Sequence, residues 1–164
     1  MLRWTDFLDV DAIRPSLEAR DPEEVLNELA GLMARRAGVS PRELALNLMA
    51  RERLGSTAME GGVAVPHCRL ARVERIVTCL GIHRGGLAFG AAEDGLVRIF
   101  VGLVSPMDTS GLHLNVLSRI ATLLRDPRLR EELLVAPSPA AIRARLVLAE
   151  DEHLLPRHEM VLGH

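Results

Sequence analysis

The chain has 164 residues, of which 48% are hydrophobic and 26% are charged. These proportions are typical of a globular protein and exclude a disordered chain, and the length suits a single domain with a sizeable core. A net charge of −2 and an aromatic content of 2% exclude a basic or base-stacking surface for nucleic acid. Every basic residue is arginine, which excludes Schiff-base and P-loop lysine chemistry.

Apolar runs and cysteine spacing indicate the cellular compartment. No apolar run approaches the roughly 20 residues that span a bilayer, and acidic residues interrupt the N-terminal segment where a signal peptide has an apolar core. Cys68 and Cys79 have no paired metal-ligand spacing, which favours free thiols in a reducing compartment. We therefore expect a cytoplasmic protein without membrane insertion, and we expect no metal and no cofactor.

Capping residues followed by proline mark the starts of the predicted helices. The pairs are Asp21-Pro22, Ser40-Pro41, Asp126-Pro127 and Ser138-Pro139. The first residue of each pair can cap a helix, and proline suits the first helical position because its missing N–H has no partner there. With their apolar stripes, these pairs predict helices over residues 22–36, 41–53, 126–134 and 138–148. A further stripe predicts a helix over residues 110–125.

Segments rich in β-branched residues alternate with these helices. They predict strands at residues 63–65, 75–83, 87–89 and 96–104, with turns at the glycines of residues 85–86 and in the AAEDG segment of residues 91–95. Residues 1–20 are expected to be irregular or to hold a short strand. Helices on either side of several strands indicate one layered α/β domain over residues 1–152, followed by a loose tail at residues 153–164.

The segment at residues 51–70, RERLGSTAMEGGVAVPHCRL, is the most informative part of the chain. It runs from a helix end through a loop of small residues into a short strand. Pro66 restricts Val65 to an extended conformation, so His67 is held at a stiff strand end. Imidazole is a good nucleophile near neutral pH, and an arginine with two hydroxyls upstream suits phosphate oxygens. From the residues alone, His67 is a plausible phosphoryl acceptor, although a histidine that follows a strand is more often structural or solvated.

The sequence LGSTAMEGGVAVPH resembles the active-site signature of the IIA components of the bacterial phosphoenolpyruvate-dependent phosphotransferase system, in the fructose/mannitol class (EIIA type 2). It is most similar to the nitrogen-regulatory IIA proteins, EIIA-Ntr. A second segment, HLNVLSRIATLLRD, also resembles this family, and the likeness extends over about residues 5–150. The resemblance implies a three-layer α/β/α sandwich with a mixed β-sheet.

The resemblance also assigns roles to individual residues. His67 would accept a phosphoryl group and pass it on, and His113 would hydrogen-bond that group or His67 itself. Arg51 would neutralise phosphate charge; without the family, it is a cation at a helix C-terminus, and Arg53 is the alternative if the register differs. Ser56 and Thr57 would donate hydroxyl hydrogen bonds to the phosphate. From the residues alone, these two belong to a loop that satisfies its own backbone.

The function implied by the resemblance is that of a phosphotransferase component, a phosphohistidine carrier that signals in a nitrogen-type phosphotransferase system. Its expected partners are an HPr-like phosphoryl donor and a regulatory target of the kinase or potassium-transport type. One alternative is a sugar-specific IIA that passes phosphate to a IIB cysteine. Another is a non-phosphorylated, EIIA-like binding domain. A hydrolase has no support, because neither a nucleophile elbow nor a carboxylate pair is recognisable.

Two neighbours of the signature need separate interpretation. Glu60 stands where the family more often has an uncharged residue, and a carboxylate near a phosphohistidine would weaken donor affinity by charge repulsion. Cys68 directly follows His67, and adjacent side chains point to opposite sides of a strand. We therefore interpret Cys68 as an apolar filler or an incidental redox sensor, and not as part of a catalytic dyad.

Overall fold

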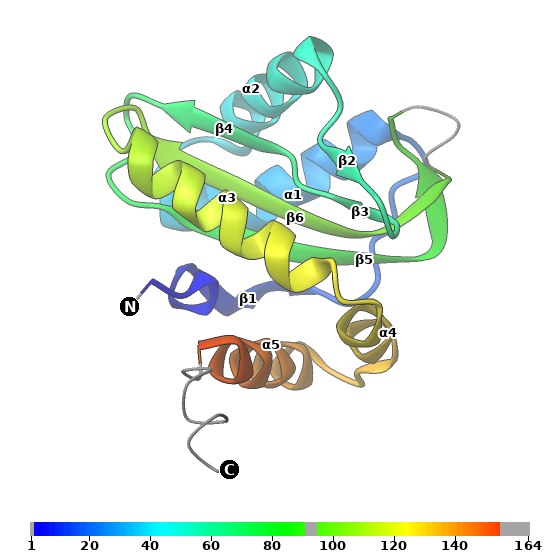
Figure 1. Cartoon of the computed structure of the whole chain (residues 1–164). Coiled ribbons are helices and arrows are strands. Elements are labelled where there is room, and N and C mark those ends of the chain that lie inside the picture. Colours follow the sequence, from blue (N-terminus) through cyan, green and yellow to red (C-terminus); the bar gives the residue numbers. More distant parts are fainter. Residues whose placement is uncertain (1, 91–94, 155–164) are drawn as a thin grey trace.

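A computed structural model describes residues 2–90 and 95–154, and the strands in these ranges form one mixed six-stranded sheet (Figure 1). The strands are β1 (Leu8–Arg14), β2 (Ala58–Met59), β3 (Val63–Ala64), β4 (His67–Leu70), β5 (Val77–Ala88) and β6 (Leu96–Pro106). Their order is β1-β5-β6-β3-β2, and β4 also pairs with β6. Both β3 and β4 are parallel to β6, whereas β5 is antiparallel to it.

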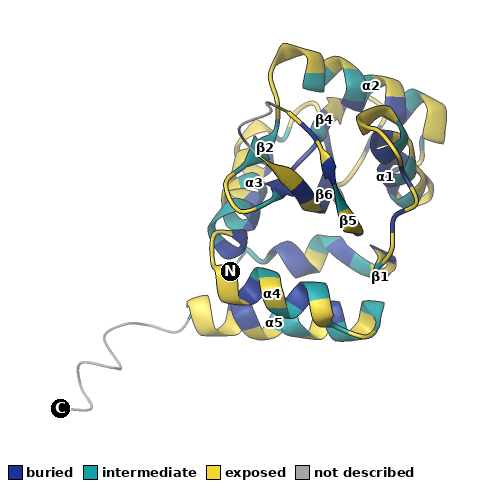
Figure 2. Ribbon diagram, turned by 90° about the vertical axis from the view of Figure 1, so that its right-hand side faces the viewer, coloured by how far each residue is buried: buried dark blue, intermediate teal, exposed yellow. Residues whose placement is uncertain are grey.

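Helices cover both faces of the sheet. They are α1 (Pro22–Ala37), α2 (Pro41–Leu54), α3 (Ser110–Leu124), α4 (Pro127–Val135) and α5 (Pro139–Leu154), with a short 3₁₀ helix, η1 (Trp4–Phe7), before β1. Helices α1 and α2 lie on one face, and α3 lies on the other with α4 and α5 below it (Figures 1 and 2). The predicted three-layer sandwich with a mixed sheet is confirmed. No helix within the described ranges is both long and apolar enough to cross a membrane.

The predicted helix starts are confirmed by their caps. The side chains of Asp21, Ser40, Asp126 and Ser138 each accept a hydrogen bond from a backbone N–H two or three residues later. The last helix extends to Leu154, beyond the predicted end at residue 148. Residues 153–154 therefore belong to α5, and residues 155–164 of the predicted tail lie outside the described residues.

The strand predictions need one correction. The segments predicted as two strands with a turn between them form a single strand, β5, which pairs with β6 along most of its length. The register shifts between Ile82 and Leu87, where Gly86 has a φ of 77°. The glycines therefore make an irregularity inside the strand, as β-bulges do, instead of a turn. The predicted turn at the AAEDG segment falls mainly on residues 91–94, which lie outside the described residues.

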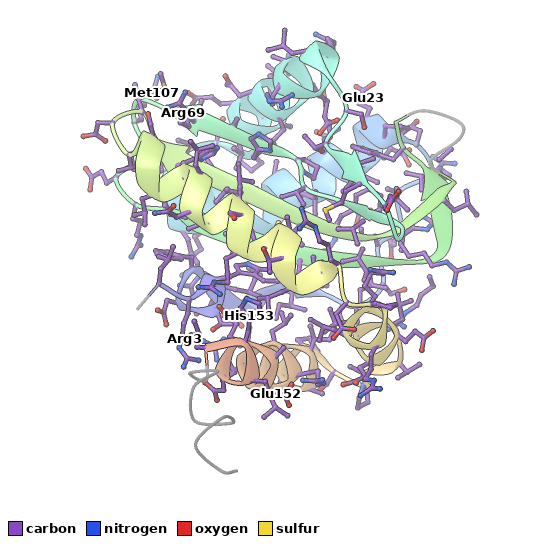
Figure 3. All side chains as sticks on the ribbon, viewed as in Figure 1. Arg3, Glu23, Arg69, Met107, Glu152 and His153 are labelled. Atoms are coloured by element: carbon purple, nitrogen blue, oxygen red, sulfur yellow. The ribbon has the colours of Figure 1, made fainter. Side chains whose placement is uncertain are left out.

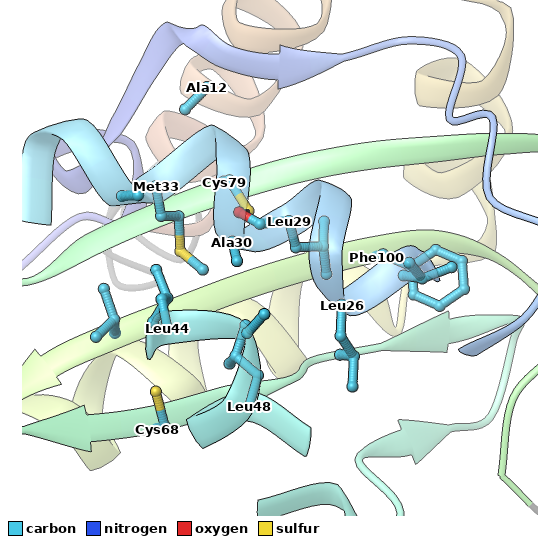
Figure 4. Close-up of a cluster of buried hydrophobic side chains, with 14 of the residues drawn as sticks. Ala12, Leu26, Leu29, Ala30, Met33, Leu44, Leu48, Cys68, Cys79 and Phe100 are labelled. Carbon is cyan, nitrogen blue, oxygen red and sulfur yellow. Dashed lines mark hydrogen bonds between the residues drawn. The ribbon is translucent and has the colours of Figure 1, made fainter. Parts of the chain in front are cut away.

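The core consists of two buried clusters, one on each face of the sheet. Along β6, Phe100 and Val104 face α1 and α2, whereas Val101 and Leu103 belong to the cluster that includes α3 and α5. This is the period-two alternation of a strand that is buried on both sides. Figure 4 shows side chains of the first cluster between α1, α2 and the sheet.

A buried carboxylate attaches the N-terminal segment to the last helix. Glu150 of α5 is 0% exposed, and its two oxygens accept hydrogen bonds from the backbone N–H groups of Trp4 and Thr5, each at 2.9 Å. Arg143 of the same helix donates to the carbonyl oxygens of Leu8 and Thr5. Figure 3 shows Arg3 at the start of the chain near the labelled Glu152 and His153 of α5. These contacts hold η1 and β1 beside the rest of the sheet.

We expect Glu150→Ala to destabilise the fold by about 2–4 kcal/mol, because it leaves two buried N–H groups without acceptors. The free energy of unfolding can be measured by urea titration, with the fluorescence of Trp4, the only tryptophan, as the probe. The matched control is Glu152→Ala on the same helix, whose residue is exposed and whose loss should change stability by less than about 0.5 kcal/mol. Equal effects of the two substitutions would contradict the role given to Glu150.

Candidate active site

His67 lies at a short interruption between two strands that both pair with β6. β3 ends at Ala64 and β4 begins at His67, so Val65 and Pro66 form the interruption. The chain stays attached to β6 there, because Leu103 N–H donates to the Pro66 carbonyl at 3.0 Å. The sequence predicted a single strand end before the histidine. In the structure the chain belongs to the sheet both before and after Pro66, and His67 is the first residue of β4. Its side chain is half-buried.

One hydrogen bond sets the orientation and tautomer of the His67 ring. Its Nδ1 lies 2.8 Å from the carbonyl oxygen of Val65. A carbonyl oxygen can only accept, so Nδ1 carries the hydrogen and donates it. The lone pair of the neutral ring is then on Nε2. The local backbone at Val65 and Pro66 therefore fixes both the position of His67 and the ring nitrogen, Nε2, that has the lone pair.

His113 approaches His67 from α3. The two ring centroids are 5.5 Å apart and the ring planes are inclined at 59°. The Nδ1 of His113 lies 2.6 Å from the hydroxyl oxygen of Ser105, a residue of β6 that is fully buried. His113 itself is buried in the first turn of its helix. The structure thus brings the two predicted histidines together.

A cavity of about 330 Å³ opens at the two histidines. It lies between the end of α2, strand β4 and the first turns of α3. Arg51 of α2 contributes to its lining, and its Nη1 also donates to the carbonyl oxygen of Gly55 at 2.9 Å. The neighbouring Arg53 is exposed and does not line it. The lining residues are Arg51, His67, Cys68, Arg69, Ser110, His113, Leu114 and Leu117.

Ser56 and Thr57 are not among the lining residues of this cavity. The hydroxyl and the backbone N–H of Thr57 both bind the carboxylate of Glu52. The hydroxyl of Ser56 accepts from the N–H of Ala58 at 3.1 Å. These contacts match the alternative in which the loop satisfies its own polar groups, and the phosphate-binding role of the two residues stays a prediction.

Glu60 also lies apart from the cavity. It borders a separate depression that Met59, Gly61, Arg125 and Arg130 line with it. The side chain is exposed in the turn between β2 and β3. Arginines therefore share the surroundings of this carboxylate, and the structure gives no contact through which it would repel a phosphoryl group on His67.

Cys68 is confirmed as an apolar filler. It is buried in the core cluster that faces α2, near Leu44 and Leu48 (Figure 4). Burial raises the pKa of its thiol to about 12, so the thiol is protonated at neutral pH. Cys68 therefore borders the cavity, but its side chain packs into the core, whereas His67 and Arg69 are less buried residues of the cavity lining.

Three polar residues of the site were missed in the sequence: Arg69, Ser105 and Ser110. Arg69 follows His67 by two positions, and the period-two rule that separates Cys68 from His67 could have found it. Ser105 is not recognisable in this way, because only the pairing of β4 with β6 brings it beside Arg69 and under His113. Ser110 is the first residue of α3, and its hydroxyl accepts from Arg69 Nη1 at 2.6 Å.

The surroundings of His67 keep its ring neutral. Burial is the largest effect and lowers its pKa, and the charge of Arg51 lowers it further. The hydrogen bond to Val65 and the charge of Glu52 oppose this shift without cancelling it. Since the pKa lies below its usual value of about 6.5, most of the rings are unprotonated at pH 7. A neutral ring is the form that has a lone pair on Nε2.

His113 is held neutral more strongly. Burial lowers its pKa to about 4, and the charges of His67 and Arg69 act in the same direction. The cavity therefore combines two neutral imidazoles with arginines that are always charged. Such a site suits an anionic group that a neutral nitrogen attacks. Among residues 2–90 and 95–154, no three His, Cys, Asp or Glu side chains lie close enough together to hold a metal ion.

Comparison with known proteins agrees with this geometry. A family model described as "Phosphoenolpyruvate-dependent sugar phosphotransferase system, EIIA 2" matches residues 6–148. The chain belongs to this family. The EIIA type 2 match covers every element from β1 to α4 and the first part of α5, including all the residues that line the cavity.

Several relatives within the family are nitrogen regulatory proteins. One from Bradyrhizobium diazoefficiens is 33% identical over 88% of this chain and 94% of its own length. Another from Pseudomonas aeruginosa is 31% identical over 87% of this chain and 93% of its own. The crystal structure of the nitrogen regulatory protein IIA-Ntr from Neisseria meningitidis superimposes with a TM-score of 0.82 at 30% identity, covering 87% of this chain and 97% of that one.

The lowered pKa of His113 predicts that the protein loses stability as the pH falls from about 6.5 towards 4. In this range the unfolded chain binds a proton on this histidine that the folded protein does not, so acid favours unfolding. In His113→Gln this contribution is absent, and the difference in unfolding free energy between pH 7 and pH 5 should be smaller. Urea titrations at the two pH values measure it. The control is His153→Gln, at an exposed position, which should keep the wild-type difference.

Proposed function

We propose that the protein is a phosphohistidine carrier of a nitrogen-type phosphotransferase system, and that His67 accepts the phosphoryl group from an HPr-like protein. The observation that supports this most is the hydrogen bond from His67 Nδ1 to the Val65 carbonyl, which leaves Nε2 as the nucleophile in a cavity lined by arginines. Family membership and the nitrogen-regulatory relatives support the same function.

The transfer step balances without an external acid or base. The lone pair of His67 Nε2 attacks the phosphorus of the donor phosphohistidine while the donor's P–N bond breaks. The donor ring leaves as a neutral imidazole, and His67 keeps its hydrogen on Nδ1. Positive charge that develops on the attacking ring is stabilised by the Val65 carbonyl oxygen. Because one P–N bond replaces another, the transfer needs mainly alignment and charge stabilisation.

Arg51 and His113 supply that charge stabilisation. The Arg51 guanidinium offers several N–H donors to the oxygens of the transferred group. In the tautomer of neutral His113 that has its hydrogen on Nε2, Nδ1 accepts from the Ser105 hydroxyl and the Nε2 hydrogen binds a phosphoryl oxygen. Preorganised donors of this kind act on charge that develops during the reaction.

The surface around the cavity suits a protein partner. Leu114 lines the cavity and is 64% exposed, and Met107 and Leu112 near the start of α3 are 53% and 37% exposed. A rim of exposed apolar side chains around a polar reactive group is typical of a protein–protein contact. We propose that the HPr-like donor and a regulatory target, of the kinase or potassium-transport type, bind this rim. Transfer to a IIB cysteine would instead indicate the sugar-specific alternative.

The proposal predicts that His67→Ala abolishes phosphorylation, because the substitution removes the accepting nitrogen. The protein is incubated with phosphoenolpyruvate, enzyme I and an HPr-type carrier, and its intact mass is measured at alkaline pH. One phosphoryl group should be added to the wild type and should be lost in acid. His153→Ala, at an exposed histidine away from the cavity, is the control and should be labelled normally. Labelling of His67→Ala would exclude His67 as the acceptor, and an unlabelled, folded wild type would favour the EIIA-like binding domain.

A second substitution tests the assigned arginine. Arg51→Gln should slow phosphoryl transfer by roughly 100-fold, the lower end of the range for a lost transition-state donor, because the cavity is open. Arg53→Gln is the matched control, since Arg53 is a neighbouring arginine that does not line the cavity. Rapid-quench measurement of phosphoprotein gives both rates. A larger effect of Arg53→Gln would mean that the register of the two arginines has been assigned wrongly.

A further inference from the structure

Arg69 belongs to the cavity by the geometry of its strand. It follows His67 by two positions on β4, and alternate residues of a strand project from the same face. Both residues line the cavity; Cys68 between them also borders it, but its side chain is buried in the core cluster that faces α2. Figure 3 shows Arg69 at the end of β4 near Met107, where the chain leads into α3. The strand therefore carries a nucleophile and a cation on one face.

The charge of Arg69 is not used in an ion pair. Arginines elsewhere in the fold pair with carboxylates, as Arg36 does with Asp9 at 2.7 Å and Arg72 with Glu43 at 3.9 Å. Within the part of the chain that the structure describes, Arg69 has no carboxylate within 4.0 Å, and its guanidinium donates to the neutral hydroxyl of Ser110. Its charge does reach the site, since it contributes to the lowered pKa of His113.

We propose that Arg69 is a second phosphoryl-binding arginine, which binds an oxygen of the phosphoryl group on His67 together with Arg51. This inference rests on the proposed function. A phosphoryl group carries a charge of about −1.5 to −2 at neutral pH. Arg51 and a neutral His113 offer it a single positive charge, and Arg69 supplies the second. The guanidinium has five N–H donors, so the bond to Ser110 leaves others for phosphate oxygens.

The contact with Ser110 has a specific consequence. It holds the long Arg69 side chain beside the first turn of α3, and His113 is in the same turn. A side chain held in advance loses less conformational freedom when it binds the phosphoryl group. Arg69 thus binds the transferred group directly, whereas Ser110 acts as a positioning residue through Arg69.

The test compares Arg69→Gln with Arg72→Gln, an exposed arginine three residues later that does not line the cavity. Each protein is phosphorylated by an HPr-type carrier or chemically with phosphoramidate, and the phosphohistidine signal is titrated against pH by phosphorus NMR. A nearby cation lowers the pKa of an anionic group, so removal of Arg69 should raise the phosphoryl pKa by about 1 unit. The amount of phosphorylated protein at equilibrium with the carrier should fall by roughly 5- to 50-fold near neutral pH. Arg72→Gln should match the wild type.

The phosphoryl pKa separates binding from a structural role. If Arg69→Gln transfers slowly but keeps the wild-type phosphoryl pKa, Arg69 acts only by holding α3, and the inference is wrong. If Arg69→Gln changes neither the phosphoryl pKa nor the phosphorylation equilibrium with the carrier, the inference about Arg69 is also wrong. The assignment of His67 as the acceptor would then still stand. Arg69→Lys, which keeps the positive charge, should leave the phosphoryl pKa close to its wild-type value. If His67 of the wild type is labelled neither by the carrier nor by phosphoramidate, the proposed function fails together with this inference. Thermal unfolding of each variant checks that it is folded.

Discussion

The hydrogen bond between His67 Nδ1 and the Val65 carbonyl depends on the interruption that Pro66 makes in the sheet. In a regular strand, the backbone carbonyl of the residue two positions before a histidine points sideways to a neighbouring strand and accepts a hydrogen bond from it. Here Val65 and Pro66 separate β3 from β4, the Pro66 carbonyl still accepts from Leu103 N–H of β6, and the His67 ring turns back to bind the Val65 oxygen. The chain on both sides stays parallel to β6, so the ring is held by the sheet while it faces the cavity.

Strand β6 connects this bond to the rest of the site. It pairs with β3 and β4 on one side and with β5 on the other, and its two faces contribute to both core clusters. Near its end, Ser105 lies beside Arg69 across the strand pair and binds His113 above the sheet. His67, Arg69 and His113 are therefore all positioned from one buried strand, which explains how residues far apart in the sequence keep a fixed geometry.

Local signals in the sequence predicted the parts that depend on local chemistry. Capping residues with proline located four helices, and the Val-Pro-His segment pointed to His67, which lies at the cavity, because both signals depend on residues that are adjacent in the chain. The pairing of β4 with β6 is a long-range feature, so Ser105 could not be found. Arg69 follows from strand alternation once β4 is recognised. The glycines of β5 signalled an irregular backbone, but glycine alone does not distinguish a bulge from a turn.

The use of arginine and histidine in one cavity divides two tasks that a single residue type could not perform. A nucleophilic histidine must be unprotonated, whereas an anionic group needs positive charge nearby. Burial lowers the pKa of both histidines, and the arginine charges lower it further. Arginine itself stays protonated at any physiological pH. The same cations that would attract a phosphoryl group therefore also lower the pKa of the imidazoles, and their charge opposes the rise in pKa that an approaching anion would cause.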